Sequence, residues 1–145
     1  MSDLVVRRAG PADLSVVASL AKARLFTAKW SADALAEELR RDDSLFLLAE
    51  SREVLGYALA RIQDGEVRLL DLAAASDGAG LGTALWDALL EAARQRGAAK
   101  LTLEVSADNA RAAAFYAKRG AKVVGRRPKF YYDGSDAVLM DLELR

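Results

Sequence analysis

The sequence predicts a mixed α+β fold built on one central sheet, and three observations lead to this prediction. Strand-like apolar runs follow one another closely between residues 45 and 73, as in locally paired strands. A long amphipathic segment at residues 81–96 then separates two apolar runs, as in a strand–helix–strand crossover. The chain has 145 residues, of which 52% are hydrophobic and 29% charged, and this suits a single globular domain over residues 1–145.

In the first half, short strands alternate with two helices. Pro11 suits the first position of a helix. Ser31 is a favourable N-cap for a second helix, because its hydroxyl can accept a hydrogen bond from an unpaired backbone N–H. The Asp64-Gly65 pair is a strong hairpin signal. Strands are expected at residues 4–8, 45–50, 54–62 and 67–73.

In the second half, helical and extended periods follow in turn. Leu81, Leu85 and Leu89 recur at helical spacing in the segment 81–96, and Gly97 ends this helix. A further helix is predicted to stop at Gly120. This helix is expected at residues 109–119, and strands are expected at residues 100–105, 122–127 and 138–144.

Composition excludes several classes of function. The formal net charge is zero, from 21 basic and 21 acidic side chains, which argues against a nucleic-acid partner. The chain has neither cysteine nor histidine, so no metal site is expected, and a base that works near neutral pH must be a carboxylate, a tyrosine, an amine or water. No apolar run approaches the length of a membrane span and the N-terminus lacks a signal-peptide core, so we expect no membrane partner and a cytoplasmic location.

A glycine-containing turn before the long helix is the first candidate site. Its residues are Asp77, Gly78, Ala79, Gly80, Leu81 and Gly82. Unpaired backbone N–H groups and the helix dipole make a helix start an anion site, and glycine lets the backbone approach a pyrophosphate. The alternative is a helix start that happens to use glycine, because this short pattern alone is weakly specific.

Two further positions carry side chains suited to acid–base chemistry. Glu104 shares one face of its strand with Thr102, where it is either a solvated carboxylate or a general base. Asn109 precedes Tyr116 by about two helical turns, so both lie on one helix face. Asn109 also suits an N-cap, and Tyr116 is either a core side chain or, as a phenol, a general acid.

The segment 126–137 interleaves three cations with three aromatic side chains, Phe130, Tyr131 and Tyr132. Such interleaving occurs in nucleic-acid sites, but the zero net charge and the short span weigh against that interpretation. We expect a loop between two strands that lines a substrate groove. The alternative is a solvated hairpin tip, with Pro128 and Gly134 as its turn residues.

Nine short stretches, in order along nearly the whole chain, carry a resemblance to a known family. They are residues 26–31, 43–50, 54–58, 80–85, 103–105, 108–110, 115–120, 124–128 and 136–140. With these stretches the chain resembles GNAT-type N-acetyltransferases. It is most similar to the ribosomal-protein-alanine N-acetyltransferase branch (RimI), for which the last three stretches are fairly specific.

The resemblance implies a mixed, mostly antiparallel sheet of about seven strands with four helices, split at the strand pair around Leu70 and Leu103, with acetyl-CoA in the cleft. It implies acetyl transfer to an α-amine, such as the N-terminal alanine of a ribosomal protein, so that a protein or peptide N-terminus is the partner. Glu104 would act as the base and Tyr116 as the acid.

The resemblance also implies two sets of contacts. The cofactor-binding residues would be Leu70, Leu72, Asp77, Gly78, Ala79, Gly80, Leu81, Gly82, Thr83, Asn109 and Tyr116. The substrate-binding residues would be Trp30, Phe130 and Tyr131.

The cofactor loop departs from the family pattern. Asp77 stands where the family has Arg or Gln, Ala79 where a basic residue is frequent, and Thr83 where Arg is frequent. A carboxylate beside a pyrophosphate opposes binding by charge repulsion. The alternative interpretation is therefore a catalytically weakened or engineered GNAT-fold protein, a binding module or a scaffold, with impaired cofactor binding.

Overall fold

The computed structural model describes residues 3–23, 30–76 and 80–145. Its strands are β1 (Val5–Arg8), β2 (Ser44–Ser51), β3 (Glu53–Gln63), β4 (Glu66–Ala74), β5 (Lys100–Ser106), β6 (Lys122–Arg127) and β7 (Ala137–Glu143). Its helices are the short 3-10 turn η1 (Pro11–Asp13) and the α-helices α1 (Leu14–Ala23), α2 (Ala32–Arg40), α3 (Leu81–Gln95) and α4 (Ala110–Lys118).

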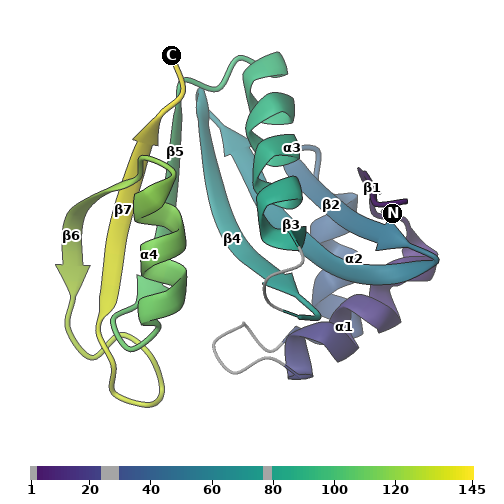
Figure 1. Cartoon of the computed structure of the whole chain (residues 1–145), viewed down its shortest axis with the longest axis horizontal. Coiled ribbons are helices and arrows are strands. Elements are labelled where there is room, and N and C mark those ends of the chain that lie inside the picture. Colours follow the sequence, from purple (N-terminus) through teal and green to yellow (C-terminus); the bar gives the residue numbers. More distant parts are fainter. Residues whose placement is uncertain (1–2, 24–29, 77–79) are drawn as a thin grey trace.

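The seven strands form one sheet in the order β1-β2-β3-β4-β5-β7-β6 (Figure 1). The neighbours β4 and β5 are parallel, because α3 carries the chain back between them. The other neighbouring pairs are antiparallel. The predicted mixed, mostly antiparallel sheet with four α-helices is confirmed.

Helices cover both faces of the sheet. Helices α1 and α2 pack on one face, where Val17, Leu35 and Tyr57 are fully buried. Helices α3 and α4 pack on the other face, and Leu85 and Leu89 of α3 are fully buried there. Because each helix buries an apolar stripe at helical spacing, the sequence pattern decides which side of the helix meets the sheet.

Local sequence signals mark the ends of these helices and strands, as predicted. The Ser31 Oγ accepts a hydrogen bond from the N–H of Ala34 at 3.0 Å and caps α2. Asp64 and Gly65 have φ angles of 53° and 76°, the left-handed pair of a tight turn between β3 and β4. Among the described residues, no helix is both long and apolar enough to cross a bilayer.

Candidate active site

Strands β4 and β5 diverge partway along their length (Figure 1). Their parallel register ends at Leu69 and Leu103, after which β4 continues beside β3 and β5 continues beside β7. The predicted split around Leu70 and Leu103 is therefore confirmed. The edge of β4 beyond Leu69 borders this split, and an extended chain could add to such an edge through backbone hydrogen bonds.

A β-bulge at Leu70 redirects the side chains of β4. Leu69 and Asp71 pair with consecutive residues of β3, so Leu70 is the extra residue. As a result, Leu70 packs against the core under α1 and α2, whereas Leu72 packs against the core under α3. The two leucines that were expected to contact the cofactor thus lie on opposite faces of β4, with Asp71 between them.

Asp71 is a candidate site residue that the sequence analysis missed. Its Oδ2 accepts hydrogen bonds from the Tyr57 hydroxyl at 2.5 Å and from Trp30 Nε1 at 3.0 Å. Burial, and then the charge of Asp71, raise the pKa of Tyr57 far above its usual value, so this phenol remains a donor. The bond from Trp30 draws the predicted substrate residue to the split. A carboxylate inside the apolar run 69–73 was the available sequence signal.

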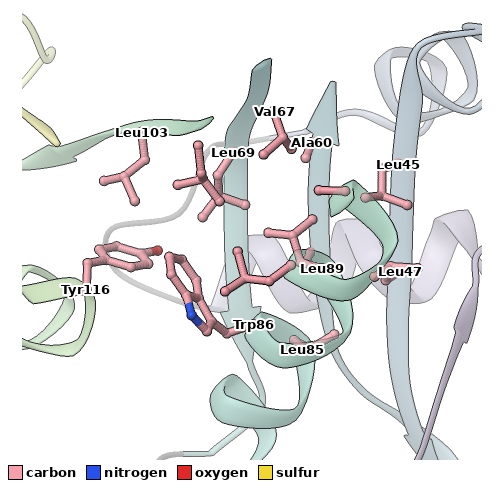
Figure 2. Close-up of a cluster of buried hydrophobic side chains, with 14 of the residues drawn as sticks. Leu45, Leu47, Ala60, Val67, Leu69, Leu85, Trp86, Leu89, Leu103 and Tyr116 are labelled. Carbon is pink, nitrogen blue, oxygen red and sulfur yellow. The ribbon is translucent and has the colours of Figure 1, made fainter. Parts of the chain in front are cut away.

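Tyr116 extends from α4 into the core beside the split, and Figure 2 shows its hydroxyl pointing toward β4. The residue is 8% exposed, and its ring centroid lies 5.5 Å from that of Trp86 and 5.4 Å from that of Phe115. Burial, and then the negative charge of Asp71, raise the pKa of Tyr116 well above its usual value. The phenol therefore keeps its proton at neutral pH, and core packing is compatible with a role as proton donor.

Glu104 lies on β5, on the face opposite the core that contains Leu103 and Tyr116. Its side chain is 13% exposed and forms an ion pair with Arg68 of the neighbouring strand β4. The carboxylate is thus not a solvated surface group, because Arg68 holds it where the two strands begin to separate. Arg68 was not predicted from the sequence, because it lies 36 positions from Glu104 and no local pattern joins the two residues.

The loop between β6 and β7 carries Tyr131, whose pKa responds to the charge of Glu104. Burial, and then the charges of Glu104 and Asp133, raise the pKa of Tyr131. Phe130 packs edge-on against Tyr131 with a centroid distance of 5.0 Å, and it is 47% exposed. The loop therefore combines an aromatic side chain near the split with an exposed one, and its role in binding an acceptor stays a prediction.

Two glycines at the start of α3 serve different purposes. Gly80 has a φ of 75° with open space around the position of a Cβ, so glycine is favoured by its backbone conformation. At Gly82 a Cβ would lie 3.3 Å from the ring of Phe115, so glycine lets α4 pack closely on α3. Leu81 is buried in the core, whereas Thr83 is exposed.

The remaining predicted cofactor residues divide into two groups. The Asn109 side chain accepts a hydrogen bond from the N–H of Ala112 at 3.2 Å, so the N-cap interpretation is confirmed and the cofactor contact stays a prediction. Asp77, Gly78 and Ala79 lie outside the described residues. Across the described ranges, no group of three or more acidic, histidine or cysteine residues is arranged to hold a metal ion.

Comparisons with known sequences identify the family. The pattern of the acetyltransferase (GNAT) family matches residues 17–121. The ribosomal protein bS18-alanine N-acetyltransferase of Escherichia coli strain K12 is 34% identical in an alignment of 104 positions that covers 68% of this chain and 70% of that protein.

Solved structures agree with this assignment. The ribosomal-protein-S18-alanine N-acetyltransferase from Escherichia coli has a TM-score of 0.87 at 27% identity, over 97% of this chain and 94% of that one. Ard1 from Thermoplasma volcanium has a TM-score of 0.89 at 27% identity, over 97% of each chain. The PaiA N-acetyltransferase from Thermoplasma acidophilum, in complex with coenzyme A, shares the fold with a TM-score of 0.83 at 22% identity, over 97% and 99% of the chains. The chain therefore belongs to the GNAT family of acetyltransferases.

Proposed function

We propose that residues 1–145 act as one catalytic domain that transfers acetyl from acetyl-CoA to the α-amine at a protein N-terminus, with alanine as the preferred first residue. The split between β4 and β5, bordered by Tyr116 and Glu104, is the observation that carries the proposal. The 34% identical Escherichia coli relative is named for the alanine of ribosomal protein bS18, which suggests the acceptor class. A ribosomal acceptor would be met in the cytoplasm.

Acetyl-CoA fits the open edge of β4 beyond Leu69. The pantetheine arm of CoA is an extended chain with amide groups, which can pair with a strand edge as another strand does. Leu70 and Leu72 would flank this arm. The thioester would then lie near Tyr116, and the pyrophosphate would meet the unpaired N–H groups at the start of α3.

The reaction is a direct attack of the amine on the thioester. The nitrogen lone pair forms a bond to the carbonyl carbon, and the carbon–sulfur bond breaks. Since an α-amine has a pKa of about 7.7–8.0, a carboxylate suffices to take up the proton that the nitrogen loses. Glu104 performs this role, and its ion pair with Arg68 keeps the carboxylate oriented.

Tyr116 donates the proton that the departing sulfur gains. Burial and the charge of Asp71 raise its pKa, so the phenol is protonated at neutral pH. A thiol has a pKa of about 8.5, so the buried phenol is the weaker acid of the two. Tyr116 therefore first stabilises the developing thiolate by a hydrogen bond, and its proton moves to the sulfur as the nitrogen's proton moves to Glu104. After CoA leaves, solvent returns a proton to the phenolate and takes one from the Glu104 carboxyl.

Acetylation of synthetic peptides tests the proposal. One peptide begins with a free alanine and contains an internal lysine, and a second has the same sequence with a blocked N-terminus. We expect mass spectrometry to detect one added acetyl group on the first peptide alone. Glu104→Gln should lower the rate by about 10²–10⁴-fold. The matched control is Glu91→Gln, which changes an exposed glutamate of α3 and should leave the rate unchanged.

Two results would contradict the proposal in different ways. Acetylation of the blocked peptide would move the acceptor from the α-amine to the lysine side chain. No acetylation together with no CoA-dependent rise in Tm would favour the non-catalytic alternative that Asp77 and Ala79 suggest.

A further inference from the structure

An arginine that follows α4 reaches the first turn of α3. The Nη2 of Arg119 donates to Thr83 Oγ1 at 2.5 Å, and its Nη1 donates to the carbonyl oxygen of Phe115 at 3.1 Å. The guanidinium carbon also lies 3.6 Å from the centroid of the Phe115 ring. Three contacts therefore hold this one side chain beside the start of α3.

The close packing of α3 and α4 at Gly82 explains why Arg119 lies beside the start of α3. A Cβ at Gly82 would lie 3.3 Å from the Phe115 ring, so the absence of a side chain lets this ring approach α3. Arg119 is the C-cap of α4, about one helical turn after Phe115, so its side chain leaves the helix on the side of that ring. It consequently emerges next to Thr83, the residue that follows Gly82.

The charge of Arg119 has no carboxylate partner within residues 3–23, 30–76 and 80–145. Its contacts there are a hydroxyl, a carbonyl oxygen and an aromatic ring, all of which are neutral. Arg68, by contrast, faces Glu104. A guanidinium that is held in position without a counter-ion favours a bound anion, and its planar set of donors matches phosphate oxygens well.

We propose that Arg119 binds the pyrophosphate of acetyl-CoA and supplies the cation that the sequence of the preceding loop lacks. This inference rests on the proposed function, because it takes acetyl-CoA as the ligand. The loop sequence Asp77-Gly78-Ala79 contains no basic side chain. Arg119 brings positive charge to the start of α3 from another element, and this charge favours a pyrophosphate bound there.

The test compares CoA binding in Arg119→Met with binding in the unaltered chain. Methionine keeps an apolar side chain against Phe115 and removes the charge. We expect isothermal titration calorimetry to give a Kd for CoA that is about 10-fold higher or more, as for loss of a hydrogen bond to a charged group. Arg119→Lys should fall between the two. The matched control is Lys118→Met, which removes an exposed charge one residue away and should leave the Kd unchanged.

Analogues of acetyl-CoA that lack one or all of its phosphates identify the group that Arg119 contacts. In the acetylation assay, acetyl-3′-dephospho-CoA retains the pyrophosphate, so Arg119→Met should raise its KM as much as it raises the KM of acetyl-CoA. S-acetylpantetheine lacks all phosphates, so its kcat/KM should be the same in both chains. An effect that vanishes with the dephospho compound, or that persists with S-acetylpantetheine, would overturn the assignment.

The binding data also separate this inference from the proposed function. If the unaltered chain does not bind CoA, the proposed function fails and the assignment of Arg119 fails with it. If the unaltered chain and Arg119→Met bind CoA equally well, the assignment of Arg119 is wrong while the proposed function stands.

Discussion

Replacement of Tyr116 by phenylalanine separates the chemical role of the hydroxyl from the packing role of the ring. The ring would keep its neighbours Trp86 and Phe115, at centroid distances of 5.5 and 5.4 Å. No cavity is created, so the free energy of unfolding at neutral pH should change by about 1 kcal/mol or less. The kcat should fall by about 10²–10⁴-fold, as expected for loss of a general acid, with the KM for acetyl-CoA unchanged.

The raised pKa of Tyr116 makes the same variant informative about stability at high pH. In the unfolded chain the phenol titrates at about pH 10, whereas the folded chain holds its proton to a higher pH because of burial and the charge of Asp71. The stabilising effect of this difference is complete below about pH 10 and is lost as the pH rises toward the folded-state pKa. Above about pH 10, unfolding releases one additional proton, and the free energy of unfolding falls by about 1.4 kcal/mol per pH unit.

Two assays test the protonation state and the catalytic role of the Tyr116 phenol. Single-turnover acetylation measures the chemical step, and denaturant unfolding from about pH 7 to about pH 11.5 measures stability. The free energy of unfolding of the unaltered chain, minus that of Tyr116→Phe, should fall by about 1.4 kcal/mol per pH unit above about pH 10, so that the variant becomes the more stable chain. Tyr57 titrates in both chains alike and cancels from this difference. A constant difference across that range would refute the buried, proton-retaining phenol. An unchanged kcat would refute its role as the acid.

Three further predictions concern Asp71, the ion pair of Glu104 and the contact between α3 and α4. Asp71→Asn removes a charge that raises the pKa of Tyr116, so the loss of kcat at high pH should begin at a lower pH than in the unaltered chain. A pH profile of kcat that is the same in both chains would show that Asp71 does not affect the pKa of Tyr116. Arg68→Met should lower kcat/KM about 10-fold, because it releases the carboxylate of Glu104. In a double-mutant cycle with Glu104→Gln, the losses of kcat/KM should be less than additive. Additive losses would mean that the two side chains act independently. Gly82→Ala should lower the free energy of unfolding by about 1 kcal/mol, because overpacking against the ring of Phe115 outweighs the gain in helix propensity. Thermal or denaturant unfolding measures this change. A more stable variant would show that the ring of Phe115 can move aside.

The elements of the fold could be predicted because the interactions that define them are local. Apolar spacing marks the strands and helices, Ser31 caps α2 through a residue three positions away, and Asp64-Gly65 makes its turn with its own backbone angles. The position of the split also followed from the sequence, through the family resemblance. That resemblance also indicated Tyr116, whose hydroxyl points toward β4 (Figure 2), and Glu104, which forms an ion pair with Arg68 of β4.

The surroundings of those two side chains were decided only by the tertiary structure. Asp71 meets Trp30 across 41 positions, and Arg68 meets Glu104 across 36. A bulge of one residue at Leu70 determines which face of β4 each of its side chains occupies, and sequence periodicity carries no signal for it.

The start of α3 shows most clearly what depends on local sequence and what depends on tertiary contacts. Its glycines predict a backbone that can approach a phosphate, and the loop sequence predicts a site without a cation. The structure adds Arg119, which lies 36 positions from Thr83 and joins it only because α4 packs against Gly82. The sequence alone thus determined the elements, the family and the composition of the loop. The charges that surround the split depend on contacts between distant segments, and those contacts exist only once the helices and strands have packed together.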